Sequence, residues 1–160
     1  PDMPFAVASG GGTIFGTTGG VTEAVLRRLA QEKNNQMLKE ISYSGVRGEE
    51  SIKEATVMVG EREVKIAVVH GLASASSLLE KIKAGEAYYD FVEVMACRRG
   101  CIMGGGQPVV IGNHDLKSRM DGIYKADVMT NIRYSDENPI LMQMYETTFK
   151  GKEHKLFHRS

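Results

Sequence analysis

The clearest pattern of apolar positions in the chain predicts two consecutive β-strands joined by a tight turn. Residues 55–59 and 64–69 are rich in β-branched side chains, and the polar residues 60–63 separate them. Two such runs around a short polar turn are typical of an antiparallel hairpin.

A helical pattern and a further strand follow this hairpin. A helix is expected to begin at a Ser74 cap and to end at Gly85. Its predicted buried face consists of Leu78, Leu79 and Ile82. Residues 89–96 then form a mostly apolar run, which predicts a strand buried on both faces. Strand, helix and strand in this order make a βαβ unit, which requires parallel strands.

The two ends of the chain carry helical patterns. Residues 9–20 are Gly-rich and predict a turn that feeds an amphipathic helix over residues 21–31, capped by Thr18 or a neighbouring backbone group. Residues 114–125 and 139–150 predict two closing helices, and a strand is expected near residues 41–43. The second closing helix carries one apolar stripe, formed by Ile140, Met144 and Phe149. These patterns predict an α/β fold: a small mixed sheet with a parallel βαβ core flanked by helices.

Composition narrows the possible partners and location. Twenty Lys and Arg balance twenty Asp and Glu, and a formal net charge of zero argues against nucleic acid and anionic membrane partners. No apolar run approaches the ~20 residues of a membrane span, and residues 1–8 lack the features of a signal peptide. Two cysteines are too few for a secreted disulfide framework, so we expect a cytoplasmic protein.

The two cysteines stand where the βαβ unit is expected to end. Cys97 and Cys101 are four positions apart, and Gly104, Gly105 and Gly106 follow at once. Ligands of open α/β sheets bind beyond the carboxyl ends of the strands, thiolates bind soft metals, and bare backbone can approach cluster sulfur closely. The pattern therefore indicates a metal or cluster site. Two buried structural cysteines or a disulfide remain alternatives, and zinc would need two more ligands.

Residues 94–108, VMACRRGCIMGGGQP, resemble the third signature of the iron-only hydrogenases, M-A-C-x-x-G-C-x-x-G-G-G-x-P. Residues 12–21, GTIFGTTGGV, resemble the I-F-G-x-T-G-G-V segment of the same family, and shorter matches at residues 46–48, 68–71 and 119–124 follow in order. The resemblance covers nearly the whole chain. It implies that residues 1–160 form the C-terminal lobe of a hydrogenase catalytic domain, without the N-terminal lobe and the ferredoxin-like domains.

The resemblance also implies a cofactor in which a 4Fe-4S cubane shares one cysteine sulfur with a diiron subsite that carries carbon monoxide, cyanide and a bridging dithiolate. By motif position, Cys97 would bind the cubane, and Cys101 would bridge the cubane to the diiron subsite. The other implied site residues are Met95, which counts with Cys101 as catalytic, Phe15 and Gly16 around the apolar pocket, and Gly104, Gly105 and Gly106 at the cofactor. A thioether and a phenyl ring suit a dry pocket, although ordinary core packing explains them equally well.

The implied activity is reversible reduction of protons to hydrogen, with a ferredoxin-like electron donor or acceptor and the rest of the catalytic domain as partners. The family's T-S-C and P-C-x-x-K signatures, which supply two further cubane cysteines, do not occur in this chain. We therefore expect a fragment, a cleaved chain or a split subunit that is inactive alone. Arg98 and Arg99 replace the Pro-Gly of many members. We expect both side chains to be solvated at the outer rim of the turn.

Two other functions remain open. Hydrogenase-like proteins of cytosolic iron-sulfur assembly or of lamin binding hold cubanes without a diiron subsite, although Met95 and the intact residues 104–108 favour a hydrogenase. A cluster-free interaction module with this fold is the third possibility. The remaining candidates are weak: the glycines do not form a nucleotide loop, and His154 and His158 are assigned no metal. His70 and Glu93 are expected to be satisfied buried groups rather than catalytic ones.

Overall fold

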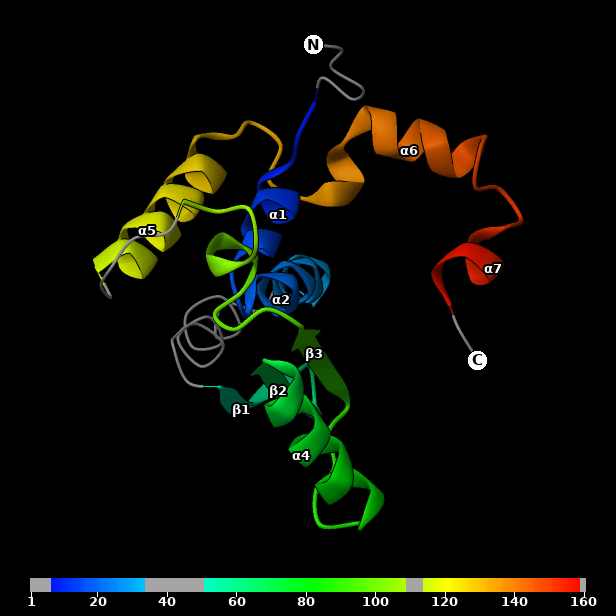
Figure 1. Ribbon diagram of the computed structural model, residues 1–160. Helices are drawn as coiled ribbons and strands as arrows, with labels where there is room; N and C mark the ends of the chain where they lie inside the picture. The colour runs from blue at the N-terminus through cyan, green and yellow to red at the C-terminus, as the bar shows by residue number, and fades with distance from the viewer. Residues whose placement is uncertain (1–6, 34–50, 109–113, 159–160) are drawn as a thin grey trace.

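A computed structural model describes residues 7–33, 51–108 and 114–158 (Figure 1). The helices are α1 (Gly10–Thr13), α2 (Gly20–Lys33), α4 (Leu72–Lys83), α5 (His114–Met129), α6 (Pro139–Glu146) and α7 (Glu153–Phe157), with 3₁₀ turns η1 (Ile14–Gly16), η2 (Cys101–Met103) and η3 (Ser135–Glu137). The strands are β1 (Ile52–Val59), β2 (Arg62–His70) and β3 (Phe91–Met95). The strand expected near residues 41–43 lies outside the described residues. The predicted α/β class is confirmed.

The three strands form one mixed sheet in the order β1-β2-β3. β1 pairs antiparallel with β2, with Ile52 opposite Val69. β2 pairs parallel with β3, with His70 opposite Met95. The predicted hairpin and the predicted βαβ unit, here β2-α4-β3, are both confirmed.

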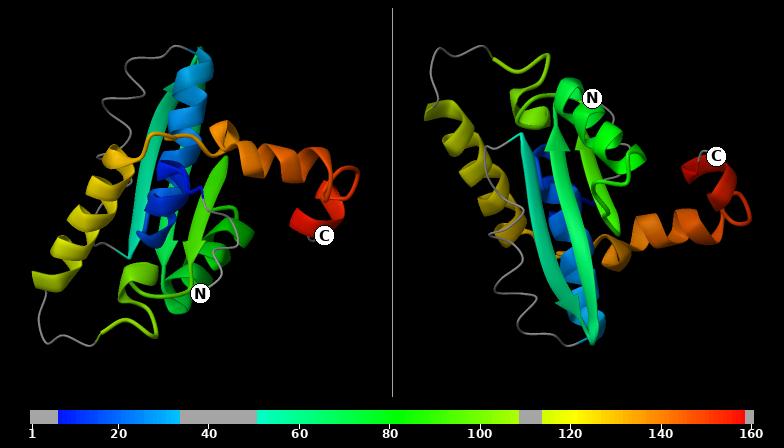
Figure 2. Two further views of the ribbon diagram at one scale, coloured as in Figure 1. Left: turned by 90° about the horizontal axis from the view of Figure 1, so that it is seen from above. Right: turned by 90° about the horizontal axis from the view of Figure 1, so that it is seen from below.

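Alternate residues of β2 face helices on opposite sides of the sheet, because side chains alternate with a period of two along a strand. Ile66 belongs to a core cluster with Leu26 of α2, whereas Val69 belongs to a cluster with Leu78 of α4. Figure 2 shows α2 and α4 on the two sides of the strands. The parallel pair of strands therefore lies between two helices.

Three local predictions around α4 and β3 are wrong. α4 begins at Leu72 with Gly71 at its N-cap, so Ser74 lies inside the first turn and does not cap it. The side chain of Leu79 is 50% exposed, because the sheet contacts the face of α4 that carries Leu78. β3 is an edge strand in the described sheet, and Val94 is 52% exposed rather than buried.

The Gly-rich segment, residues 9–20, forms α1 and η1 rather than a simple turn. The Ser9 hydroxyl caps α1 by accepting a hydrogen bond from the Gly12 amide at 3.2 Å. A Cβ atom at Gly10 would overlap the Asp127 carboxylate, and one at Gly20 would overlap the Ile14 carbonyl. Glycine is required at both positions because other parts of the chain occupy the space of a side chain.

The C-terminal helices form an arm that extends away from the sheet in Figures 1 and 2. Asn138 caps α6 by accepting hydrogen bonds from two backbone amides. The rings of Tyr145, Phe149 and Phe157 pack together with centroids 5.3–5.9 Å apart. α6 ends at Glu146, so the stripe predicted to continue to Phe149 on one helix is interrupted by a turn. The described helices are all too short or too polar to cross a membrane.

Candidate metal centre

Cys97 and Cys101 lie directly after β3, at the carboxyl ends of the two parallel strands. The Gly71 amide, just after β2, donates a hydrogen bond of 2.8 Å to the Met95 carbonyl and joins the two strand ends. Both cysteines are free thiols and both are exposed. The predicted position at the carboxyl edge of the sheet is confirmed, and the alternatives of a disulfide or of buried structural cysteines are contradicted.

The cysteine loop, residues 97–108, packs on the Gly-rich segment through Gly100. Gly100 has φ +85°, and its amide donates to the Cys97 carbonyl at 3.2 Å. An ideal Cβ at Gly100 would lie 2.7 Å from the Thr18 nitrogen and 2.9 Å from the Gly16 oxygen. The two backbones therefore touch with no room for a side chain, and this contact places Gly16 beside the cysteine loop.

Gly100→Ala is expected to destabilise the full-length protein by about 2–3 kcal/mol, because it adds a strained positive φ and a clash with two backbone atoms. Urea unfolding measures this change. Gly105→Ala is the matched control, since nothing lies within 4 Å of an ideal Cβ there. Equal unfolding midpoints for the two variants would show that the loop does not depend on this contact.

Gly104 leaves space beside the first thiol. An ideal Cβ at Gly104 would lie 3.1 Å from the Cys97 sulfur, whereas Gly105 and Gly106 face open space. Two exposed thiols beside a bare backbone wall fit the ligation of a soft metal or an iron-sulfur cluster. They supply two of the four thiolates of a cubane. In the described ranges, no group of three or more His, Cys, Asp or Glu side chains could hold a metal on its own.

Met95 and Phe15 differ in their relation to this loop. Met95 is half-buried at the end of β3, two residues before Cys97. Phe15 is 43% exposed and lines a hollow beside Val25 and Arg28; the described lining of this hollow contains no residue of the cysteine loop. The position of Met95 suits its predicted role, whereas the roles of both residues remain predictions.

The buried carboxylate of Glu93 ties β3 to α2. The side chain is 4% exposed, and its oxygens accept hydrogen bonds of 2.7 Å from the Gly19 amide, the Thr22 amide and the Thr22 hydroxyl. A carboxylate at a helix N-terminus is stabilised by these amides and by the helix dipole. Glu93 is thus a satisfied buried group, as predicted. The Thr18 hydroxyl, predicted as a possible cap, makes no hydrogen bond in the described part of the chain.

Glu93→Gln is expected to cost about 1.5–3 kcal/mol of unfolding free energy, because hydrogen bonds to a charged acceptor are lost and an amide NH₂ must face other donors. Urea unfolding measures the loss. Glu61→Gln, at an exposed position in the hairpin turn, is the control and should leave the midpoint unchanged. A loss for Glu93→Gln no larger than that of the control would contradict the capping role.

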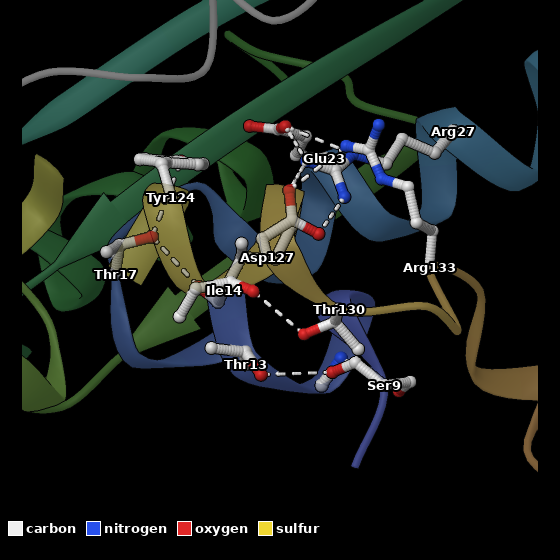
Figure 3. A network of polar contacts seen from close by, with 12 residues as sticks. Ser9, Thr13, Ile14, Thr17, Glu23, Arg27, Tyr124, Asp127, Thr130 and Arg133 are labelled. Atoms are coloured by element: carbon white, nitrogen blue, oxygen red, sulfur yellow. Dashed lines mark hydrogen bonds and ion pairs between the residues drawn. The ribbon is translucent and has the colours of Figure 1, made fainter. Parts of the chain in front are cut away.

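A buried ionic network joins α2 to α5 and the segment after it (Figure 3). The Arg27 guanidinium donates to both Asp127 oxygens at 2.8 and 2.7 Å and to Glu23 at 2.6 Å, and Arg133 donates to Asp127 at 3.1 Å. Burial raises the pKa of Asp127, but hydrogen bonds and charge from Arg27 and Arg133 outweigh it and hold this pKa below its usual value. Burial lowers the pKa of the Arg27 guanidinium, but the carboxylates of Asp127 and Glu23 outweigh burial and raise this pKa above its usual value.

Arg119 of α5 contacts the cysteine loop from outside. Its Nη1 donates to the Ile102 carbonyl at 2.7 Å, and its Nη2 donates to the Pro108 carbonyl at 2.7 Å. Asp115, one turn earlier, lies 3.6 Å from the same guanidinium. The sequence analysis placed Arg119 in a motif of the family but gave it no role. The i, i+4 spacing of Asp115 and Arg119 predicts an ion pair on one helix, but it does not predict the contact of Arg119 with the loop.

The remaining candidates have ordinary surroundings. Arg98 is exposed as expected, and its stem packs 3.2 Å from the Cβ position of Gly71. Arg99, also expected to be solvated, is instead half-buried and has φ +66°. His154 and His158 stack with ring centroids 4.9 Å apart, and the described residues bring no third ligand to them.

Comparison with known proteins gives two consecutive family matches. Residues 1–105 match the iron only hydrogenase large subunit, C-terminal domain, and residues 113–160 match the iron hydrogenase small subunit. The chain is 42% identical to the NADP-reducing hydrogenase subunit HndD of Solidesulfovibrio fructosivorans, over 98% of this chain and 28% of that protein. It is 41% identical to iron hydrogenase 1 of Clostridium pasteurianum, over 94% of this chain and 28% of that protein. The chain thus spans less than a third of these relatives.

A solved structure and a more distant relative complete the comparison. The FeFe-hydrogenase HydA1 of Chlamydomonas reinhardtii aligns with a TM-score of 0.67 and 34% identity, over 98% of this chain and 47% of that one. The cytosolic iron-sulfur assembly component 3 of Mus musculus is 29% identical, over 86% of this chain and 29% of that protein. The likeness to hydrogenases is therefore the stronger of the two.

Proposed function

Because the chain belongs to the iron-only hydrogenase family, we propose that it is the C-terminal lobe of a hydrogenase catalytic domain, followed by a small-subunit-like segment. The activity of the complete protein would be reversible reduction of protons to hydrogen. The observation that supports this proposal most directly is the pair of free, exposed thiols at the carboxyl edge of the sheet, with Gly104 leaving space beside the Cys97 sulfur.

Under this proposal Cys97 and Cys101 hold iron. Cys97 would hold a 4Fe-4S cubane, and Cys101 would be a ligand shared by the cubane and a diiron subsite with carbon monoxide, cyanide and dithiolate ligands. When bound, this cofactor supplies the two-electron chemistry of hydrogen. The protein's own contribution is ligation, exclusion of water and a fixed loop. Met95, Phe15 and Gly16 would line the apolar side of the site, and Gly104, Gly105 and Gly106 would leave room for the cluster.

Two of the four cubane ligands must come from outside the cysteine loop, because a cubane takes four thiolates and this chain has two cysteines. We propose that the rest of the catalytic domain supplies them and that a ferredoxin-like protein exchanges electrons with the cluster. We also propose a cytoplasmic location. One relative, 48% identical over 69% of this chain, is a periplasmic Fe hydrogenase large subunit, so cell fractionation is the test of location.

The second candidate function is a cubane protein of iron-sulfur assembly without hydrogenase activity. The identity of 29% to such a protein, against 42% to a hydrogenase subunit, supports the first candidate. Met95 and the intact triple glycine support it as well.

The test uses the full-length protein, produced in a host that matures hydrogenases. We expect iron and sulfide in the amounts of a cubane plus a diiron subsite, infrared bands of bound carbon monoxide and cyanide, and hydrogen turnover. A cubane without these infrared bands would favour the assembly class. Iron-free protein with both thiols free would overturn the proposal in favour of an interaction module.

A further inference from the structure

Helix α5 contacts both segments of the candidate site. Arg119 reaches the cysteine loop, and Ile123, one turn later, lies 3.8 Å from the Cβ position of Gly16. The Tyr124 hydroxyl is 3.5 Å from the Thr17 hydroxyl, a contact drawn in Figure 3. α5 lies in the part of the chain that matches the hydrogenase small subunit. This part therefore packs directly on the two segments that would surround the cluster.

Among the residues of α5, Arg119 makes the contacts that bracket the loop. The two carbonyls it binds, at Ile102 and Pro108, lie at either end of the triple glycine. The backbone hydrogen bonds within this part of the loop are local: the Met103 amide donates to the Gly100 carbonyl, the Gly104 amide to the Cys101 carbonyl, and the Gln107 amide to the Gly104 carbonyl, at 3.0–3.3 Å. Fixing three consecutive glycines in one conformation is unfavourable, because glycine loses more conformational entropy on folding than any other residue. Hydrogen bonds from Arg119, outside the loop, restrict its conformations.

The chemistry of the guanidinium suits this task. Its donors have a fixed planar arrangement, so one side chain can hold two carbonyls at a set separation, whereas a lysine ammonium acts as a point charge on a flexible stem. Arg119 is mostly buried, with 21% of its side chain exposed, and Asp115 lies close enough to orient it. The two bonds of 2.7 Å are short, as expected for a charged donor.

We propose that Arg119 is a positioning residue that fixes the loop after Cys101 and thereby sets the geometry and potential of the cluster that Cys101 holds. The small-subunit-like segment then acts on the metal centre through a helix that binds no metal. The effect on the cluster rests on the proposed function, whereas the effect on the loop does not.

The test compares three variants of the full-length holoprotein: Arg119→Met, Arg119→Lys and Lys117→Met. Lys117 is an exposed residue of the same helix and is the matched control. We expect amide hydrogen exchange at Met103, Gly104 and Gln107 to be about tenfold faster in Arg119→Met, intermediate in Arg119→Lys and unchanged in Lys117→Met. The midpoint potential and the electron paramagnetic resonance spectrum of the cubane should follow the same order.

Amides of β2 serve as the reference in each sample, since a general loss of stability accelerates them too. Loop exchange and cluster spectrum that match the Lys117→Met control would overturn the proposal. Faster exchange in the loop that merely parallels faster exchange in β2 would overturn it too, because a positioning role requires a local effect. A wild-type protein without a cubane would refute the proposed function instead, and the exchange rates would still decide whether Arg119 holds the loop.

Discussion

Cys101→Ala in the full-length protein is expected to lower hydrogen turnover by at least about 100-fold and to remove the infrared bands of the diiron subsite. Loss of a residue that only supports a metal ligand already costs about 10–100-fold, and Cys101 is proposed as a ligand itself. In the described residues, no cluster of three or more His, Cys, Asp or Glu side chains could hold the metal instead. Iron content, infrared spectra and hydrogen evolution measure the effect.

Ser76→Ala is the control for this variant, because Ser76 is exposed on α4 and the substitution also removes one polar atom. It should retain full activity and full iron content. If Cys101→Ala keeps its infrared bands and half or more of its activity, the bridging role of Cys101 is wrong.

Asp127→Asn is expected to lower the unfolding free energy by about 3–5 kcal/mol, because it leaves the buried Arg27 charge without its main partner. Asp127 is 1% exposed, and both of its oxygens bind Arg27. Urea unfolding of the full-length protein measures the loss. Asp136→Asn is the matched control: Asp136 pairs with Arg28 at 2.9 Å on the surface, where such pairs contribute about 0–1 kcal/mol. Similar losses for both variants would contradict a special role for the buried network.

The same network predicts an acid dependence of stability. The pKa of Asp127 is lower in the folded protein than the ordinary value of about 3.9, which applies to the unfolded chain. A lowered pKa contributes stability that is fully present above the unfolded value and is lost as the pH falls through the folded value. Wild type should therefore lose part of its stability below about pH 4, and Asp127→Asn should lose less over that range. A parallel decline in both proteins would contradict this assignment.

The sequence predicted the elements that depend on local pattern. The hairpin of β1 and β2, the βαβ unit and the stop of α4 at Gly85, which has φ +74°, all follow from residue type and periodicity. The predicted cap at Ser74 failed because the chain reverses at Gly71, whose amide is bound to β3. The predicted burial of Val94 failed because strand pairing, and not hydrophobicity, decides which strand lies at an edge.

In the candidate site too, the sequence predicted the features that depend on local pattern and missed those that depend on distant residues. The spacing of Cys97 and Cys101 and the motif around them predicted where ligands would gather, and the thiols are free and exposed there. The support for that loop was not predictable, because it comes from residues far away in the sequence. Gly100 touches Thr18, and Arg119 reaches past the triple glycine. A single sequence contains no local signal for such contacts.

The bond between Glu93 and the start of α2 has a consequence for how the sheet assembles. A slip of β3 by one residue would turn the carboxylate toward the α4 side and place a valine beneath the amides of Gly19 and Thr22. Such an arrangement would leave both amide donors without their acceptor, so the misaligned pairing is less stable than the observed one. The Glu93 side chain thereby favours the register of β3 that positions Cys97 and Cys101 at the edge of the sheet.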